Sequence, residues 1–348
     1  MKRYVLLLML LVAALLPAAA GEDQPFDVNG YIFGHISDSY EWHVTTIHDH
    51  PVAIYLPVIV RSRTTGWHCF SSRHIAEGEE YEGFHIAAGD EKPAGKVVER
   101  LSDGTLVKPF DISITKNVLS LMMSSVLLVV LVLLTSRWYR RHDVLGEAPT
   151  GLAGVMEMMV MMIYDDVIKD AVGRDADRYA PYLLTAFFFI FLNNLLGIIP
   201  FFPGGANLTG NIAVTLFLAV CTFLAVNLFG NKHYWKDILW PDVPMFLKVI
   251  PLMPLIEIIG MFTKPFSLMI RLFANIMAGH IMLLGVVAVV FLTAHLGAAL
   301  NSGLTVIAVL FGVFLDVLEL LVAFLQAYVF TMLSSVFIGL SRQESETE

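Results

Sequence analysis

The sequence Ile-Arg-Leu-Phe-Ala-Asn-Ile-Met-Ala-Gly-His-Ile-Met-Leu-Leu at residues 270–284 is the most informative stretch of the chain, because it places a charge inside a long apolar run. A charged side chain near the centre of a bilayer costs about 2.5–3.5 kcal/mol on insertion scales, so Arg271 needs a partner or a water-lined cavity. A guanidinium stays protonated in proteins, so Arg271 cannot relay a proton but can hold an anion or act as a barrier. The stretch therefore predicts a membrane helix with a functional arginine.

The composition places the chain among polytopic membrane proteins. Hydrophobic residues make up 57% of the chain and charged residues 15%, with a mean hydropathy of +0.70. Several apolar stretches reach the length that a membrane-spanning helix needs. The formal net charge of −9 and the acidic tail at residues 342–348 give no basic surface, so we expect no nucleic-acid partner. The two cysteines, Cys69 and Cys221, lie in polar and apolar sequence respectively and predict no disulfide framework.

Residues 1–20 have the pattern of a secretory signal peptide. Lys2 and Arg3 precede a short apolar core, and Ala18-Ala19-Ala20 offers a cleavage site. The alternative is an uncleaved anchor. If the peptide is cleaved, we expect residues 21–116 to form an extracytoplasmic segment.

The extracytoplasmic segment contains seven of the eleven histidines, including His43, His48 and His50. They lack companion ligands at a recognisable spacing, so we expect surface histidines, no metal site and no cofactor. The alternating run at 53–60 and the turn signal Ser102-Asp103-Gly104 favour short strands. The segment is therefore predicted to be a small β-rich domain.

From residue 117 to 341 the chain reads as a membrane domain. A first span at 118–135 ends in the basic and aromatic cluster at 137–141, which marks a cytoplasmic boundary. The stretch at 152–178 mixes apolar and charged residues and fits a helix on the inner surface. Residues 182–229 predict a helical hairpin, whose loop has no lysine or arginine and is therefore an outside loop.

Two further apolar segments, at 245–296 and 303–340, are too long for upright spans. A continuous helix over the first would measure about 75–80 Å, against a hydrocarbon core of about 30 Å. Each segment either divides into two spans or lies steeply tilted. Candidate break points in the first are Pro251, Pro254, Gly260 and Pro265, and the sequence does not choose between the alternatives.

The polar residues in these two segments form a pattern. Asp316, Glu319 and Gln326 are spaced so that they lie near one stripe of a helix, and we expect them to form one polar seam. Arg271 and Asn275 share a face of the preceding helix. His280 follows nine residues after Arg271 and points roughly to the opposite side, so the two faces imply two roles.

Each of these side chains alone is compatible with simple helix packing. Together they are explained more economically by one hydrated pathway, in which histidine and glutamate are suited to pass a proton near neutral pH. Ser267 and Lys264 extend this polarity towards the inner surface, or merely bond the backbone and snorkel.

Four sequence segments resemble subunit a of the F-type ATP synthase. They lie at 194–200, 211–215, 264–280 and 325–330, and the resemblance covers roughly residues 117–341. The order Arg271, Asn275, His280, with glutamine on the last helix, is its most specific part.

The resemblance implies roles position by position. Arg271 matches the essential arginine that faces a ring of c subunits. Many relatives carry an acid where this chain has His280 and a histidine where it has Glu319, so the pair is exchanged here, and Gly197 replaces an aspartate of some relatives. The half-channel open to the outside is matched by Asn194, Asn275, His280, Glu319 and Gln326, and the inner half-channel by Glu257, Lys264 and Ser267. We add Asp316 to the pathway from its place in the seam.

The resemblance also implies an all-α architecture of five membrane-spanning helices, the last two long and steeply tilted around the c-ring. The N-terminus would lie outside and the C-terminus in the cytoplasm, in the cell inner membrane. Implied partners are the c-ring, the b subunits of the peripheral stalk and, indirectly, the F1 sector. The chain has no Gly-x-x-x-x-Gly-Lys-Ser/Thr motif, so ATP chemistry would belong to those partners.

Two other classes compete with this interpretation. A self-contained secondary transporter would use Arg271 to bind an anionic substrate and would be expected to show internal repeats, which we do not find. A membrane hydrolase would need a motif such as His-Glu-x-x-His or Gly-x-Ser-x-Gly, and neither is present.

Overall fold

The computed structural model describes residues 27–343 except 48–49, 89–90, 92, 102, 144–145, 200–201, 203, 240–251 and 295–297. The expected signal peptide at 1–20 and most of the acidic tail lie outside the described residues. The chain divides into two units, one made of Met1–His35 with Gly279–Val317 and the other of Ile36–Ala278 with Leu318–Glu348. Each unit is described by itself.

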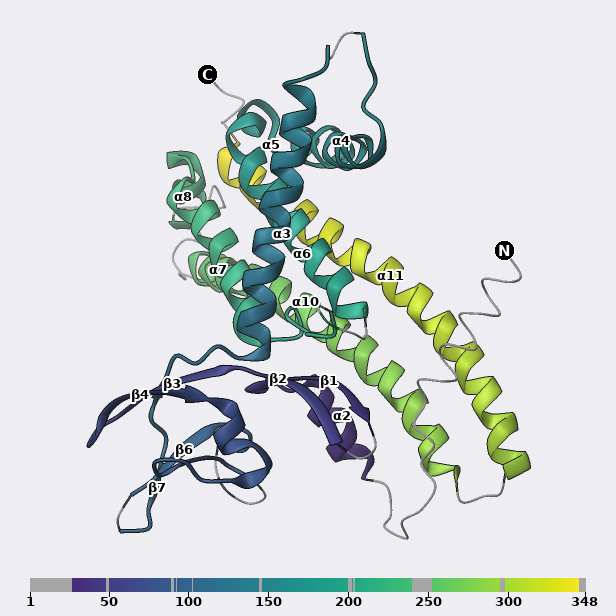
Figure 1. Cartoon of the computed structure of the whole chain (residues 1–348). Coiled ribbons are helices and arrows are strands. Elements are labelled where there is room, and N and C mark those ends of the chain that lie inside the picture. Colours follow the sequence, from purple (N-terminus) through teal and green to yellow (C-terminus); the bar gives the residue numbers. More distant parts are fainter. Residues whose placement is uncertain are drawn as a thin grey trace. The chain divides into compact units, whose positions relative to one another are not determined.

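The N-terminal part of the larger unit is β-rich, which confirms the expectation for this segment (Figure 1). Strands β1 (Glu41–Ile47) and β2 (His50–Tyr55) form an antiparallel hairpin. Strand β3 (Pro57–Ser62) lies between β4 (Gly66–Ser71) and β8 (Phe110–Asp111). A third sheet has the order β5 (Phe84–Ile86), β6 (Val97–Arg100), β7 (Leu106–Val107).

A small apolar core holds these strands together. Strand β3 alternates between exposed and buried positions, as a strand with one face on a core should. Its buried residues Val58 and Val60 pack with Tyr40, Phe84 and Val97. The Tyr40 hydroxyl also donates a hydrogen bond to Asp111 at 2.5 Å, which ties the start of the domain to its last strand.

The membrane domain begins with helix α3 (Lys116–Tyr139), which is longer than the expected span at 118–135. Helix α4 (Gly151–Ile163) follows, and the chain then stays helical to residue 198 through a π-helical turn (Tyr164–Lys169), α5 (Asp170–Val172), a 3₁₀ turn (Gly173–Asp175) and α6 (Ala176–Ile198). The expected surface helix at 152–178 is thus joined to the next span without a loop. The chain changes direction at 164–175, where the helix type changes, so that α4 runs across the direction of α6 in Figure 1.

The expected hairpin consists of α6 and α7 (Ile212–Leu228). Helix α7 is followed by the short α8 (Lys232–Leu239) at a bend of 98°. Four helical segments in the described part of the chain are long and apolar enough to cross a membrane, or five if α7 and α8 form one broken span.

The two long apolar segments each form one helix. Helix α10 (Leu252–Leu292) has 41 residues and continues through Pro265, and α11 (Ala298–Arg342) has 45. At 1.5 Å per residue these helices measure roughly 60 and 70 Å, about twice the thickness of a hydrocarbon core. Among the break points that the sequence offered, Gly260 and Pro265 therefore do not divide the segment, and Pro251 lies outside the described residues.

Close packing fixes the end of α11 against the helices that precede the hairpin. A Cβ atom at Gly339 would lie 1.9 Å from the carbonyl oxygen of Ala171, so only glycine allows this approach. Three residues further on, Arg342 donates hydrogen bonds to Asp175 at 2.5 Å and to Asn231 at 2.7 Å. The C-terminal end of α11 is thereby held by three separate segments.

In the smaller unit, helix α2 (Val28–Ile36) packs against the C-terminal part of α10. The rings of Tyr31 and Phe291 are 5.9 Å apart. Near the end of α10, Thr293 donates a hydrogen bond to Asn301 of α11 at 3.0 Å.

Candidate functional site

Helix α10 presents a polar stripe on an exposed, otherwise apolar face. Lys264, Ser267, Arg271 and Asn275 follow one another at intervals of three and four residues and are all exposed, and Glu257 continues the stripe seven residues before Lys264. The buried face of the same helix carries Leu268, Met269, Leu272 and Ile276. Because a lipid-exposed arginine is costly, this face is suited to a protein partner or to water rather than to acyl chains.

The polar residues of α11 differ in burial. Glu319 and Gln326 are buried, with exposed fractions of 7% and 9%, whereas Asp316 is exposed. The three residues were expected to form one seam, and by helical spacing Asp316 does lie within the stripe that continues as Ala323, Ala327 and Phe330. Asp316 is exposed because it comes early on α11, where no described residue before Leu315 is buried.

Asn194 of α6 joins α11 between its two buried polar residues. Its Nδ2 donates to the carbonyl oxygen of Ala323 at 3.1 Å, and its Oδ1 accepts from Thr209 at 2.7 Å. Ala323 lies four residues after Glu319 and three before Gln326, so the amide sits within one turn of both. All four side-chain hydrogen-bonding residues of this cluster, Asn194, Thr209, Glu319 and Gln326, are buried.

The loop that carries Thr209 is tightly packed. Its residues 206–210 are all buried, and Asn207 Oδ1 accepts the backbone N–H of Gly210 at 2.8 Å. Residues 207–209, Asn-Leu-Thr, have the pattern of an N-glycosylation sequon and are buried. Thr209 was not among the residues predicted for this site, because a threonine in a loop has no local pattern that indicates its partner.

A second polar chain, also missed by the sequence analysis, crosses three helices. Tyr182 of α6 and Thr222 of α7 are joined at 2.8 Å, and Thr222 is joined to Ser334 of α11 at 3.2 Å. Thr222 and Ser334 are buried in otherwise apolar runs. Hydroxyl residues in such runs are common, so their positions in the sequence do not show that they are hydrogen-bonded to one another.

In α6 and the loop that follows it, two buried amides have atoms with no hydrogen-bond partner among the described residues. They are Asn193 Oδ1, whose Nδ2 donates to Phe189, and Asn207 Nδ2. Buried polar atoms are normally satisfied by protein or by ordered water. Both asparagines are adjacent in sequence to the cluster around Asn194 and Thr209, which makes this region favourable for water.

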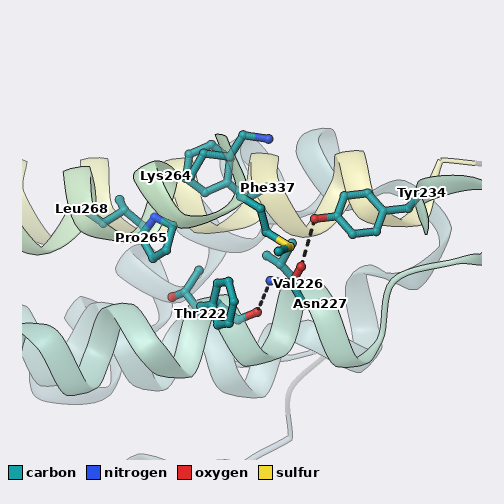
Figure 2. A pocket seen from close by; sticks show the side chains of 10 residues that line it. Thr222, Val226, Asn227, Tyr234, Lys264, Pro265, Leu268 and Phe337 are labelled. Carbon is teal, nitrogen blue, oxygen red and sulfur yellow. Dashed lines mark hydrogen bonds between the residues drawn. The ribbon is translucent and has the colours of Figure 1, made fainter. Parts of the chain in front are cut away.

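A pocket of about 270 Å³ lies between α7, α8, α10 and α11 (Figure 2). On one side of it the Tyr234 hydroxyl donates to Asn227 at 3.1 Å. Lys264 of the exposed stripe lies at its edge, with its ammonium group 5.7 Å from the ring centre of Phe337. Lys264 therefore connects the stripe to a partly polar pocket, while Glu257 and Ser267 remain on the exposed face.

The nine candidate residues fall in both units. Arg271, Asn275, Glu319, Gln326, Asn194, Ser267 and Glu257 belong to the larger unit, and His280 and Asp316 to the smaller one. Along α10, His280 follows Arg271 by about 13–14 Å and is partly buried. In the described part of the chain, no group of three or more histidine, cysteine or acidic residues is arranged to hold a metal ion.

Comparison with known proteins gives two family matches that meet near the start of α3. Residues 120–339 match the model of the ATP synthase A chain, and residues 31–117 match a domain of unknown function (DUF8433). Similar curated proteins include ATP synthase subunit a 2 of Chlorobaculum tepidum, 39% identical over 78% of this chain and 80% of that protein. ATP synthase subunit a of Pelodictyon phaeoclathratiforme is 42% identical over 76% and 78%, and that of Myxococcus xanthus is 39% identical over 71% and 77%.

Proposed function

The chain belongs to the ATP synthase A chain family, and from this premise we propose that it offers two offset proton half-channels to the carboxyl groups of a c-ring, with Arg271 as the barrier between them. The observation that carries the proposal is the exposure of Arg271 on a face of α10 that is otherwise apolar. A face of this kind needs a partner inside the membrane, and a ring of acidic side chains supplies both the opposite charge and the apolar surface.

The outer half-channel is assigned to the buried cluster around Asn194. Glu319 is a carboxyl group that can exchange a proton, and Gln326, Asn194 and Asn275 can orient water beside it. His280 and Asp316 extend this path along α10 and α11. Two observations support this assignment. Glu319 and Gln326 are buried, and Asn194 of α6 donates a hydrogen bond to the carbonyl oxygen of Ala323, which lies between them on α11.

The inner half-channel is assigned to the polar residues that precede Arg271 on α10. Glu257, Lys264 and Ser267 lie on the same stripe as Arg271, and Lys264 borders the pocket in Figure 2. The stripe gives a continuous series of polar groups from the start of α10 to the arginine.

The mechanism follows from electrostatics. A c-ring carboxyl group can face lipid only when it is neutral, whereas a carboxyl group opposite Arg271 is favoured in its ionised form. Protonation on one side of Arg271 and release on the other then force each proton to travel with the ring. Each charge that crosses gains about 2.3 kcal/mol per 100 mV of membrane potential.

The proposal includes an arrangement in the membrane. Helices α10 and α11 lie steeply tilted around the c-ring, which accommodates lengths about twice the hydrocarbon thickness. The β-rich segment lies outside and the C-terminus inside, in the cell inner membrane, and b subunits connect the chain indirectly to the F1 sector. The translocated ion is H⁺.

The decisive experiment is ATP-driven proton pumping in inverted vesicles that contain the assembled complex with Arg271→Ala. We expect pumping to be lost, and passive proton leak to increase in vesicles stripped of the peripheral ATPase sector. Thr263→Ala is the matched control, because Thr263 is exposed on the same helix and bonds only its own backbone, at Gly260. Normal pumping with Arg271→Ala in an assembled complex would refute the proposal and favour an independent transporter.

A further inference from the structure

The β-rich segment contacts the loop of the proposed outer half-channel through one aromatic pair. Trp42 of β1 is 3% exposed, and its ring meets that of Phe202 edge to face with 5.3 Å between ring centres. Phe202 lies in the loop between α6 and α7. Edge-to-face aromatic pairs add stabilisation beyond the area that they bury.

The base of the β-rich segment is fixed to the membrane domain only a few residues before Trp42. The backbone N–H of Lys116 donates to the carbonyl oxygen of Ser39 at 2.9 Å, and that of Asn117 donates to Asp38 at 3.1 Å. These bonds satisfy the first backbone donors of α3, which have no partner inside the helix. Trp42 is thus connected rigidly to the start of α3 on one side and touches the loop on the other.

The loop carries this contact to the buried polar cluster. Seven residues after Phe202, Thr209 donates to Asn194, and Asn194 donates to Ala323 of α11. Nearer to Thr209 the loop is closely packed, since residues 206–210 are buried and a Cβ atom at Gly204 would lie 2.4 Å from the carbonyl oxygen of Ile199. A displacement that reaches Gly204 has little room to be absorbed before it reaches Thr209.

We propose that Trp42 is a positioning residue of the outer proton path, which holds Phe202 and thereby keeps residues 204–210, further along the same loop, closed over Asn194. The β-rich segment then has a role in proton access. This inference rests on the proposed function, because it takes the Asn194 cluster to be part of the outer half-channel. It goes beyond the family match, which assigns no function to residues 31–117.

The first test measures closure of the loop without any proton assay. Ala206, which is 2% exposed, is replaced by cysteine in a chain that lacks Cys69 and Cys221, and the assembled complex is treated with a membrane-impermeant maleimide from the outer side. Trp42→Ala is expected to raise the labelling rate by between about twofold and about tenfold, the range that corresponds to one aromatic pair. Trp42→Phe, which keeps an aromatic ring, should restore most of the protection.

A second variant covers the case in which Trp42→Ala unfolds the β-rich segment. Phe202 is 40% exposed, so Phe202→Ala removes the same contact with less loss of packing. In separate chains that retain it, labelling of the exposed Cys69 shows that the reagent has access to the outer side. Unchanged labelling of Ala206→Cys in the Phe202→Ala variant would overturn the inference.

The second test asks whether the contact acts through Asn194. Passive proton conduction is measured as a function of outer pH for Phe202→Ala, Asn194→Ala and the double variant. The single Phe202→Ala change should shift the pH profile, and the double variant should resemble Asn194→Ala alone, since coupled sites are not additive. Additive effects would overturn the inference, whereas intact ATP-driven pumping with Arg271→Ala would refute the proposed function and leave the labelling result unaffected.

Discussion

Asn194 and Ala323, 129 residues apart in the sequence, are joined by a hydrogen bond of 3.1 Å from the side-chain amide to the main-chain carbonyl. The bond does not depend on the identity of the side chain at position 323. It therefore fixes the position of α11 along α6 whatever the side chain at position 323 is. Because Glu319 and Gln326 lie within one turn of Ala323, this bond also positions them relative to Asn194.

Removing the hydroxyl group of Thr209 should weaken this connection. Thr209→Val keeps the shape of the side chain but leaves the buried Oδ1 of Asn194 without its donor, at a cost of about 1–3 kcal/mol. Thermal unfolding of the complex in detergent should occur at a lower temperature, and ATP-driven pumping should fall. Thr215→Val is the matched control, because Thr215 is also buried but bonds only nearby backbone carbonyls. Equal effects of the two substitutions would exclude a special role for Thr209.

The two acids of α11 should differ in their importance. Glu319→Gln removes a buried proton-exchanging group and is expected to reduce ATP-driven pumping by about a hundredfold, the lower end of the effect of losing an acid–base residue. Asp316→Asn changes an exposed residue and should have a much smaller effect. The measurement is the initial rate of pumping per assembled complex. A larger loss with Asp316→Asn would place the path on the exposed side of α11.

A side chain at Gly339 should disrupt the end of α11. The added Cβ atom would lie 1.9 Å from a backbone oxygen that cannot rotate away, so Gly339→Ala should destabilise the chain by about 1–3 kcal/mol or more. The control is Gly312→Ala on the same helix, where nothing lies within 4 Å of the new atom and helix propensity favours alanine. Thermal unfolding of both variants checks the prediction, and it is wrong if both tolerate alanine equally.

The β-rich segment should lose stability in alkali through Tyr40. Burial, followed by the hydrogen bond to Asp111, raises the pKa of the Tyr40 hydroxyl above its usual value of 10.0. Because the folded state holds this proton more tightly than the unfolded state, the stabilisation is complete below about pH 10 and is lost as the pH rises further. Near-ultraviolet circular dichroism should show a steeper alkaline loss of structure for the natural chain than for Tyr40→Phe. Equal slopes would contradict this.

Much of the architecture could be predicted from the sequence because it depends on long apolar runs. The length of a run indicates a membrane helix, and the alternating pattern at 53–60 indicates strands, so α3, the hairpin and the β-rich segment were expected. The continuity of α10 through Pro265 was not predictable from the sequence. A proline lowers helix stability locally, whereas the packing of the buried residues Leu268 and Leu272 stabilises the helix, and the sequence does not show which effect is larger.

The candidate site was predictable only in part. Charged and amide residues stand out in apolar runs because placing them in a membrane costs free energy. For this reason Arg271 and Glu319 were predicted as candidates from the sequence. The partners of Asn194 were not, because one is a backbone carbonyl and the other is a threonine in a loop. The difference in burial between Asp316 and Glu319 also escaped prediction, since helical spacing gives relative angles but not how far along α11 the neighbouring helices extend.

Pro265 has a consequence for how the pocket between α7 and α10 can be studied. Proline has no backbone N–H, so the carbonyl oxygen of Met261, one turn earlier, receives no bond from it along the helix. Both residues line the pocket. The main chain of a residue that lines the pocket thus lacks its usual helical donor, and a scan that replaces only side chains other than Pro265 would leave that gap unchanged.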